Sequence, residues 1–475
     1  MLGLAAAFSG PAAATNDAMM DLLKLLKDKG SITAEEYELL TSAAKAGAEQ
    51  VEGRVNEVKT LSAQMPKVET KDKITIGSQD GDFQWQPVGR VMADYDWVDS
   101  DKSKLGSGAE IRRARLGMQG VLWKHWIWKA EFDFADATVA SKDLYVGYQG
   151  DTSWGKYNAK MGQQHVPFGL STMSSSKYML FTERPLLSDN VLQPGRQLGA
   201  SIFATNAKNW TFHAGAFAGP EENPNNCLLT VFSAPTPPDT AYKTFDECDE
   251  QLNFAARGTF DPYVQDATHL LHVGAAVLYK DPQDSALRVR QRPGGIHEVD
   301  SRFVDVDFKQ SADDVTAFNV EAAAIWGPFN LQSEYTHWDV NRQPSDGSPA
   351  GTPNPPAVAL DGWYVEAGWF LTGEAMAWKP EEATYGGVKP LGIVGKGGFG
   401  AWQVALRYDV LDLNDSGAGV IGGEETDLRV GLNWYVNNTM RFMIDYTDVL
   451  SLDRPGNSND NNEPSAVTLR SQVYW

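Results

Sequence analysis

Residues 466–475 decide the fold, and they read Ala-Val-Thr-Leu-Arg-Ser-Gln-Val-Tyr-Trp. Leu469 and Val473 share one parity of this stretch, whereas Arg470 and Gln472 share the other. Successive side chains of a strand point to opposite faces, so the stretch predicts a strand with one apolar face and one polar face. About ten residues is also the length with which a tilted strand crosses an outer membrane. The segment therefore predicts a membrane-crossing strand.

The same alternation of apolar and polar residues recurs from about residue 83 onward. It predicts an all-β fold, an antiparallel transmembrane barrel of about sixteen strands, an even number as bacterial barrels prefer. The expected strands are 83–98, 110–123, 125–136, 139–150, 157–167, 196–206, 210–219, 252–263, 269–281, 315–327, 329–341, 360–373, 400–414, 425–437, 439–450 and 466–475. A soluble β-sandwich is the alternative, but it does not need so many strands of this length.

The connections between the expected strands alternate in length. Short ones include 124–125, 327–328 and 437–438, and the long ones are 168–195, 220–251, 282–314, 342–359 and 451–465. Short turns on one side and long loops on the other are typical of outer-membrane barrels. Segment 374–399 is an exception, because it is long yet falls on the side of the short turns. It either contains an unrecognised hairpin or folds into the barrel.

Composition is compatible with such a barrel and excludes other classes. The chain has 475 residues and a net charge of -21, which argues against nucleic-acid binding because that needs a basic surface. No window approaches 18 consecutive apolar residues, so the sequence predicts no helical membrane span. Aromatic residues are plentiful, with Trp 15, Tyr 16 and Phe 20, as girdles at the two membrane interfaces require.

The chain divides into three expected parts. Residues 1–16 have the small residues and short apolar run of a signal-peptide remnant, with a disordered tail as the alternative. Residues 17–70 have a helical pattern and are expected in the periplasm. Residues 71–475 form the barrel domain.

Two signals support the helical part. Thr33 and Glu36 have the spacing of a capping box, which predicts the start of a helix. Val51, Val58 and Met65 then follow roughly at coiled-coil spacing. A short coiled coil of three chains and a single solvated helix that acts as a spacer are equally compatible with this pattern.

The two cysteines, Cys227 and Cys248, lie in one Pro- and Asn-rich stretch between strand patterns. They predict a disulfide that closes a surface loop in an oxidising compartment. Two free thiols remain an alternative, and a metal pair is disfavoured because no histidine lies nearby. The sequence contains no metal, cofactor or catalytic motif, so we expect neither an enzyme nor a cofactor.

Strand parity assigns a set of cationic side chains to the lumen. They are Arg113, Arg115, Lys129, Arg257, Arg407, Arg429, Arg441 and Arg470. Guanidinium groups stay charged and match the geometry of an oxyanion, so a row of them lets an anion move between weak sites. Carboxylates such as Glu131, Asp133 and Asp409 have the same parity, and the alternative is that the arginines merely neutralise them.

Loop 168–195 adds a candidate oxyanion site. Ser175, Ser176, Lys177 and Arg184 provide hydroxyl donors and positive charge within this one loop. The alternative is that Glu183 and Arg184 simply pair and hold the loop to the wall.

Several motifs of the chain, in the same order, resemble the phosphate-selective porins O and P. They are Ile111–Gly117, Gly162–Gly169, Ser175–Tyr178, Glu183-Arg184, Pro194–Arg196, Leu371–Glu374, Gly400–Trp402 and Leu406–Tyr408. The resemblance implies a trimeric outer-membrane barrel whose pore is narrowed by loop 168–195, with segment 374–399 tucked in from the periplasm. It also implies that Ser175, Ser176, Lys177 and Arg184 contribute to a phosphate site.

These observations predict a porin in the outer membrane of a Gram-negative-type bacterium, in contact with outer-membrane lipid. Its expected function is passive diffusion of small anions, phosphate or a similar oxyanion, through a homotrimer. Two alternatives stay open. One is a general or weakly selective, even cation-tolerant, porin, and the other is a structural outer-membrane protein tethered through its helices.

Overall fold

The structure is a computed structural model that describes residues 9–70, 73–135, 139–188, 190–218, 252–282, 285–345, 348–349 and 351–475. The chain separates into two compact units. One comprises residues up to 70 together with 75–84, and the other comprises 71–74 together with 85–475. None of the described helices combines the length and the apolarity needed to cross a membrane.

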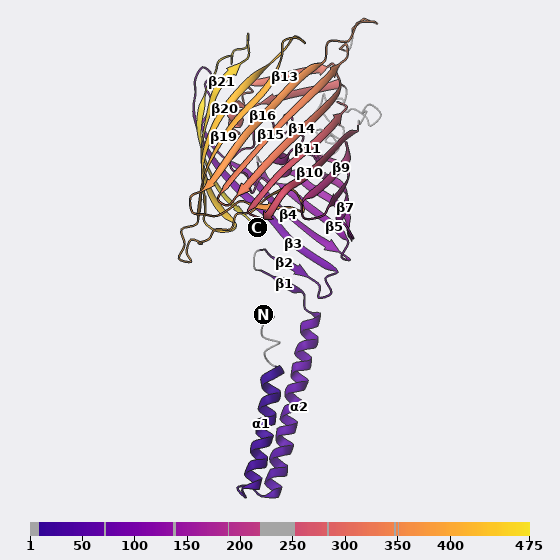
Figure 1. The fold of residues 1–475 in the computed structure, drawn as a ribbon, viewed down its shortest axis with the longest axis vertical. Coiled ribbons are helices and arrows are strands. Elements are labelled where there is room, and N and C mark those ends of the chain that lie inside the picture. The colour runs from indigo at the N-terminus through magenta and orange to yellow at the C-terminus, as the bar shows by residue number, and fades with distance from the viewer. Residues whose placement is uncertain are drawn as a thin grey trace, which may run out of the picture. The chain divides into compact units, whose positions relative to one another are not determined.

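The first unit is mainly two helices that lie side by side, α1 (Ser9–Asp28) and α2 (Ala34–Gln64) (Figure 1). Helix α2 begins with the predicted capping box. The hydroxyl of Thr33 accepts the Glu36 N–H at 3.2 Å, and the Glu36 carboxylate accepts the Thr33 N–H at 2.7 Å. Two short strands, β1 (Lys67–Glu69) and β2 (Thr75–Gly77), pair after the helices. Capping of α2 is thus confirmed.

The second unit is a closed barrel of 16 antiparallel strands, as the sequence predicts (Figure 1). Its wall strands, in chain order, are β3 (Phe83–Asp99), β4 (Gly108–Leu122), β5 (Trp126–Asp133), β6 (Ala140–Thr152), β7 (Gly155–His165), β8 (Arg196–Thr205), β9 (Trp210–Ala218), β10 (Asn253–Asp266), β11 (His269–Lys280), β14 (Ala312–Trp326), β15 (Phe329–Arg342), β16 (Val358–Phe370), β19 (Ala401–Asp415), β20 (Val420–Tyr435), β21 (Met440–Asp453) and β22 (Ser465–Tyr474).

The barrel closes where β22 pairs with β3. Leu469 lies opposite Tyr95 in this pairing. Beyond β22, the backbone groups of Trp475 and Gly89 exchange two hydrogen bonds of 3.2 Å each. The Trp475 ring lies directly over Gly89, where an added Cβ atom would approach the ring to 2.3 Å, so only glycine fits at this position.

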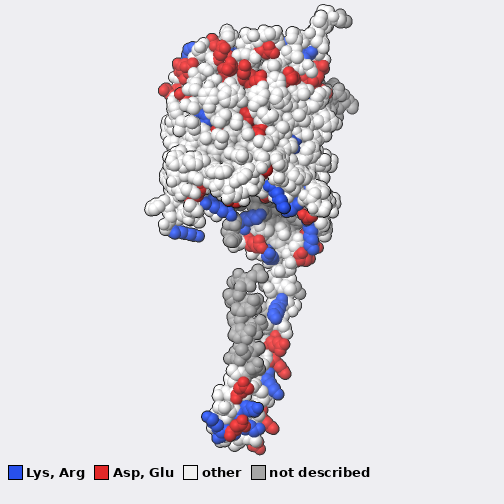
Figure 2. Space-filling view, in the orientation of Figure 1, with Lys and Arg blue, Asp and Glu red and all other residues white. Residues whose placement is uncertain are grey.

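The two faces of the wall have the predicted polarity. In β22, Leu469 and Val473 are exposed on the outside, whereas Arg470 and Gln472 are each only 2% exposed on the inside. Figure 2 shows the result on one face, where a broad band almost free of charge crosses the barrel and acidic side chains gather at one rim. The apolar band is the surface that lipid requires.

Two of the long connections contain hairpins whose strands the sequence analysis did not place. Segment 282–314 contains a hairpin, β12 (Ala286–Gln291) with β13 (Val304–Gln310), and a 3₁₀ turn, η4 (Pro293–Gly295). Segment 374–399 contains the small hairpin of β17 (Ala377–Lys379) and β18 (Thr384–Gly386). Treating segment 282–314 as a plain loop was wrong, because strands this short carry too little periodicity to separate from turns. A hairpin in segment 374–399 was one of the two alternatives that the sequence left open.

The small hairpin β17–β18 lies against inward-facing side chains of the wall. The guanidinium group of Arg257 on β10 donates to the carbonyl of Ala383 at 3.0 Å, and the indole N–H of Trp378 donates to Asp261 at 3.1 Å. Both alternatives for segment 374–399 therefore hold, since it contains a hairpin and it folds into the barrel.

An apolar core lies inside the barrel, formed by the inserted segments and the wall. Phe168 and Leu192 of loop 168–195 are fully buried together with Phe303, which precedes β13, and with inward residues of the wall such as Leu411. A lumen filled with water alone would not bury these groups. The inserted segments are therefore packed parts of the fold.

Candidate functional site

Wall arginines hold loop 168–195 through its backbone. Arg441 on β21 donates to the carbonyl of Met179 at 2.7 Å. Arg407 on β19 donates to the carbonyls of Glu183 and Arg184 at 2.9 and 3.2 Å. Because both residues are at most 2% exposed and donate to carbonyls of the loop, they act as its docking points.

Arg470 on β22 combines a backbone contact with two ion pairs. It donates to the carbonyl of Thr182, and its guanidinium group is within 2.5 Å of Asp94 and 2.9 Å of Glu183. Its side chain has no exposed surface. Arg470 is therefore buried on the inner side of the wall, and its charge is balanced by carboxylates.

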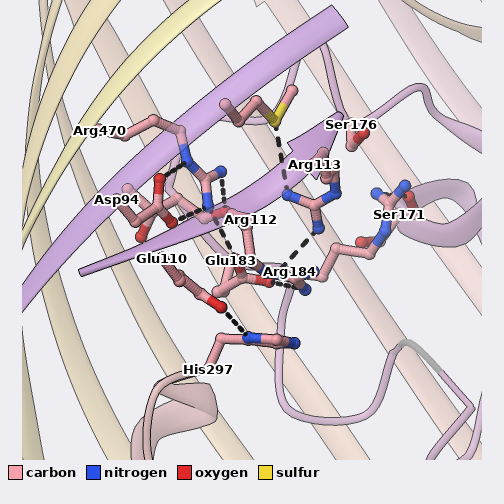
Figure 3. Close-up of polar contacts among 12 residues, drawn as sticks. Asp94, Glu110, Arg112, Arg113, Ser171, Ser176, Glu183, Arg184, His297 and Arg470 are labelled. Atoms are coloured by element: carbon pink, nitrogen blue, oxygen red, sulfur yellow. Dashed lines mark hydrogen bonds and ion pairs between the residues drawn. The ribbon is translucent and has the colours of Figure 1, made fainter. Parts of the chain in front are cut away.

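Glu183 is the meeting point of three arginines (Figure 3). Arg112 donates to its two carboxylate oxygens at 2.7 and 2.9 Å, Arg470 donates at 2.9 Å, and Arg113 lies at 3.5 Å. Burial alone would raise the pKa of Glu183, but the three guanidinium groups outweigh it and hold that pKa well below its usual range. Glu183 is therefore a carboxylate anion held by three guanidinium groups.

The sequence offered a pairing of Glu183 with Arg184 as an alternative, and the described contacts of the two residues go to different groups. Arg184 donates to the carbonyls of Ser171 and Ser174 at 2.6 and 2.9 Å, within its own loop. Glu183 does hold the loop to the wall, but through the wall arginines Arg112, Arg113 and Arg470.

Arg112 was not among the predicted lumen residues, because strict alternation places it on the opposite face from Arg113. Both residues nevertheless contact Glu183. Alternation is therefore interrupted at this pair, a local irregularity of the kind that re-aims side chains in barrels. The adjacent pair of arginines in the sequence was the available signal.

The remaining predicted wall cations also have carboxylate partners. Arg115 pairs with Asp133 at 2.7 Å, Lys129 with Asp143 at 2.5 Å, Arg257 with Glu321 at 2.6 Å, and Arg407 with Asp409 at 2.5 Å. Arg429 donates to the carbonyl of Gly294 in the other inserted segment and lies 3.9 Å from Asp445. Most of the predicted cationic row is thus neutralised locally.

Lys177 differs from these cations. In the part of the chain that the structure describes, its ammonium group has no ion-pair partner and lies over the rings of Tyr178 and Tyr474, at 5.9 and 5.4 Å. Burial, and then the positive charge of Arg90, lower the pKa of this loop lysine to about 8. Lys177 is therefore a poorly compensated positive charge.

Arg90 on β3 lies near both Lys177 and the predicted serines. Its positive charge acts on Lys177. Its guanidinium group donates to the hydroxyl of Ser176 at 2.7 Å, approaches Ser175 at 3.4 Å, and lies 3.2 Å from Glu131. Its buried Nε–H has no partner among the described residues. The sequence analysis placed the strand correctly but did not assign Arg90 to the lumen.

Lys379 of β17 is a second cation that the sequence did not reveal. Its ammonium group lies 5.7 Å from the centre of the Tyr178 ring and 2.9 Å from Glu382. Lys177 lies over the same ring, so the loop and the small hairpin bring two lysines to one tyrosine. The predicted disulfide between Cys227 and Cys248 lies outside the described residues and stays a prediction.

Comparison with known proteins places this geometry in a family. The profile of the family "Phosphate-selective porin O and P" matches residues 86–475. Porin O of Pseudomonas aeruginosa is 27% identical over 440 residues, which cover 86% of this chain and 92% of that protein. An uncharacterized protein of Caulobacter vibrioides is 28% identical over 374 residues, covering 77% of this chain and 68% of that protein.

Among solved structures, an anion-selective porin from Comamonas acidovorans has a TM-score of 0.49 at 11% sequence identity, covering 83% of this chain and 100% of that one. The family profile spans nearly all of the barrel, including loop 168–195 and both inserted hairpins. The chain therefore belongs to the phosphate-selective porin O and P family, and it is an outer-membrane porin.

Proposed function

We propose that this porin passes small anions and binds an oxyanion such as phosphate beside Lys177. The observation that carries the proposal is the contrast between Lys177 and the wall arginines. Lys177 has no ion-pair partner among the described residues, whereas the wall arginines are held by carboxylates and loop carbonyls. A permeating anion interacts most strongly where positive charge is not already balanced.

The charges around Lys177 favour an anion. Arg90 and Lys129 both disfavour its protonated form, and Glu131 is the carboxylate that opposes them. An oxyanion bound among these groups relieves the repulsion between like charges. Ser175 and Ser176 add hydroxyl groups, which can donate a hydrogen bond to a phosphate oxygen.

Lys379 adds a cation from a second inserted segment to the proposed site. It belongs to the small hairpin β17–β18, whereas Lys177 belongs to loop 168–195, and both lie over Tyr178. Two lysines on separate inserted segments suit a divalent oxyanion, because each ammonium group can approach a different oxygen. Arg184, which is bonded to carbonyls of its own loop, is proposed to position that loop rather than to bind the anion.

A weakly selective porin is the second candidate, and one observation favours it. The carboxylates that neutralise the wall arginines, among them Asp133 and Asp409, leave a lumen of mixed charge. In that case Lys177 would be a local feature without control over selectivity.

Planar-bilayer measurements separate the two candidates. With the proposed site, the reversal potential in a salt gradient indicates anion preference, and low phosphate blocks the chloride current. Lys177→Gln should weaken both effects. Lys309→Gln is the matched control, because it removes the same charge from an exposed position on β13. Equal behaviour of the two variants would favour the weakly selective porin.

We further propose that the protein is a homotrimer embedded in outer-membrane lipid, with α1 and α2 in the periplasm. The apolar outer band of the barrel supports contact with lipid (Figure 2). Removing residues 17–66 should leave conductance unchanged. Impaired assembly or envelope attachment after this deletion would indicate a tether, and normal assembly would indicate a spacer.

A further inference from the structure

The last part of segment 374–399 exposes apolar side chains. Leu391 and Phe399 are 78% and 84% exposed, which is more than any other large apolar side chain among the residues that the structure describes. Earlier in the same segment, Met376 and Trp378 are only 2% and 5% exposed, in the interior of the barrel. Exposed apolar groups that share one surface mark a contact with a partner or with a membrane. Residues 389–399, the rim loop, therefore need a partner.

The rim loop is held in this conformation through its backbone. The Leu391 N–H donates to the carboxylate of Glu374 at 2.9 Å, and Glu374 is itself only 4% exposed. The Val394 N–H donates to the carbonyl of Val436, which follows β20, at 3.1 Å. These bonds join the loop to the start of its own segment and to the next turn along the rim. Exposure of its apolar side chains is therefore part of the fold.

The rim loop continues a row of aromatic rings on the outer face of the wall. The carbonyl of Phe399 accepts the indole N–H of Trp434 at 2.8 Å. The Trp434 ring stacks on Trp402 at 5.3 Å and on Phe442 at 5.7 Å between ring centres. These rings lie at the short-turn ends of β19, β20 and β21, where aromatic girdles meet the lipid headgroups on the periplasmic side. Phe399 therefore extends the girdle beyond the ends of the strands.

Two lysines give the rim loop a positive charge. Lys389 and Lys396 are both exposed, and no Asp or Glu occurs from residue 383 to residue 408. The chain as a whole carries a net charge of -21, and acidic side chains gather at the opposite rim of the barrel (Figure 2). Lysines next to exposed apolar groups form the combination with which proteins bind an anionic membrane surface.

We propose that the rim loop anchors the barrel in the periplasmic leaflet of the outer membrane. Leu391 and Phe399 enter the boundary between headgroups and acyl chains, and Lys389 and Lys396 bind the phosphate groups of anionic phospholipid. A lipid surface offers apolar chains and phosphates side by side, which matches both features of the loop and continues the girdle. The inference is independent of the proposed anion site, because Lys177 does not belong to the rim loop.

The first experiment measures what surrounds position 399. Phe399→Cys is made in the full-length protein with Cys227→Ser and Cys248→Ser, labelled with nitrobenzoxadiazole and reconstituted in vesicles of phosphatidylethanolamine and phosphatidylglycerol. Brominated acyl chains should quench the label as strongly as a label at Met161, which is 71% exposed on the wall. Asp300→Cys is the control in water, since the side chain of Asp300 is 100% exposed.

Two results would overturn the proposal. Quenching of the label at position 399 by aqueous iodide, without quenching by brominated chains, would place the rim loop in water. Protection of the label from both quenchers would mean that a second copy of the chain covers the loop.

The second experiment tests the lysines by native mass spectrometry of the protein released from detergent. The unaltered protein should retain phosphatidylglycerol in preference to phosphatidylethanolamine, and Lys389→Gln combined with Lys396→Gln should reduce that preference severalfold. Lys309→Gln is the matched control and should leave the preference unchanged. An unchanged preference in the double variant would overturn the binding of headgroups by the loop. These variants alter only exposed side chains, so they keep the proposal testable should Phe399→Cys fail to fold.

Discussion

The wall formed by β19 to β22 and the region around Lys177 both carry positive charge, but they use it differently. Arg407 and Arg470 on the wall donate to backbone carbonyls of loop 168–195 and pair with carboxylates. Lys177, on the loop itself, faces tyrosine rings and other cations. The positive charges of the wall therefore stabilise the structure, whereas the positive charge of Lys177 is available to a solute. Counting arginines in a lumen does not give selectivity, whereas identifying the partners of each one does.

The largest effect is expected from Arg470→Gln, which removes a structural cation. Its loss leaves Asp94 buried without its partner and weakens the support of Glu183. Breaking a buried ion pair from one side costs about 3–5 kcal/mol. We expect this loss in denaturant unfolding of the barrel in detergent. If the free energy of unfolding did not change, Arg470 would not be a structural cation, and the contrast with Lys177 would fail.

Lys177→Glu should have the next largest effect, on transport rather than stability. Reversing the charge at the proposed site should raise the phosphate concentration needed for half-block at least ~10-fold, which corresponds to about 1.4 kcal/mol. Reversal potentials should shift toward cations in the same recordings, while thermal unfolding stays near that of the unaltered protein. A large loss of stability would instead class Lys177 with the wall arginines.

Anion binding should also depend on pH near 8. The pKa of Lys177 is lowered to about 8. Its side chain is therefore positively charged below that pH and loses the charge as the pH rises through 8. Block of the chloride current by sulfate, whose own charge is constant in this range, should therefore weaken between pH 7 and pH 9. Lys177→Gln should abolish the pH dependence. A profile that stays level in the unaltered protein would contradict the role of Lys177.

The smallest effect is expected from Arg288→Gln on the β12–β13 hairpin. Arg288 pairs with Asp305 at 2.6 Å, but its side chain is 47% exposed. Exposed ion pairs contribute little, so the free energy of unfolding should change by less than about 1 kcal/mol. Phosphate block should not change. This variant serves as a reference for the other three predictions. It removes an ion pair whose arginine is exposed and lies away from the proposed sites.

The sequence predicts the wall well because lipid imposes a period of two on every strand. Residues such as Leu469 and Arg470 must alternate between hydrocarbon and lumen, and that alternation is visible without any structure. The rule fails where a constraint other than lipid acts. Arg112 and Arg113 both turn inward to reach Glu183, a contact from a loop about 70 residues later that no local pattern reports.

The inserted segments could not be predicted for a related reason. Hairpins β12–β13 and β17–β18 lie inside the barrel, so no lipid face imposes alternation on them. Their partners, such as Arg257 for Ala383, are distant in sequence. The loop motif around Lys177 was recognisable, but the contributions of Arg90 and Lys379 depend on which elements meet, and single-sequence patterns do not contain that information.

Closure of the barrel at Gly89 and Trp475 has a mechanical consequence. β3 and β22 are neighbouring wall strands that no turn connects, so their junction is a seam held by backbone hydrogen bonds and by one indole ring resting on a glycine. Every other neighbouring pair in the wall is also tied by the chain that runs between them. A side chain at position 89 would displace the ring and weaken the pairing of β3 with β22. Under force or on heating, these two strands should therefore separate before any other pair of the wall.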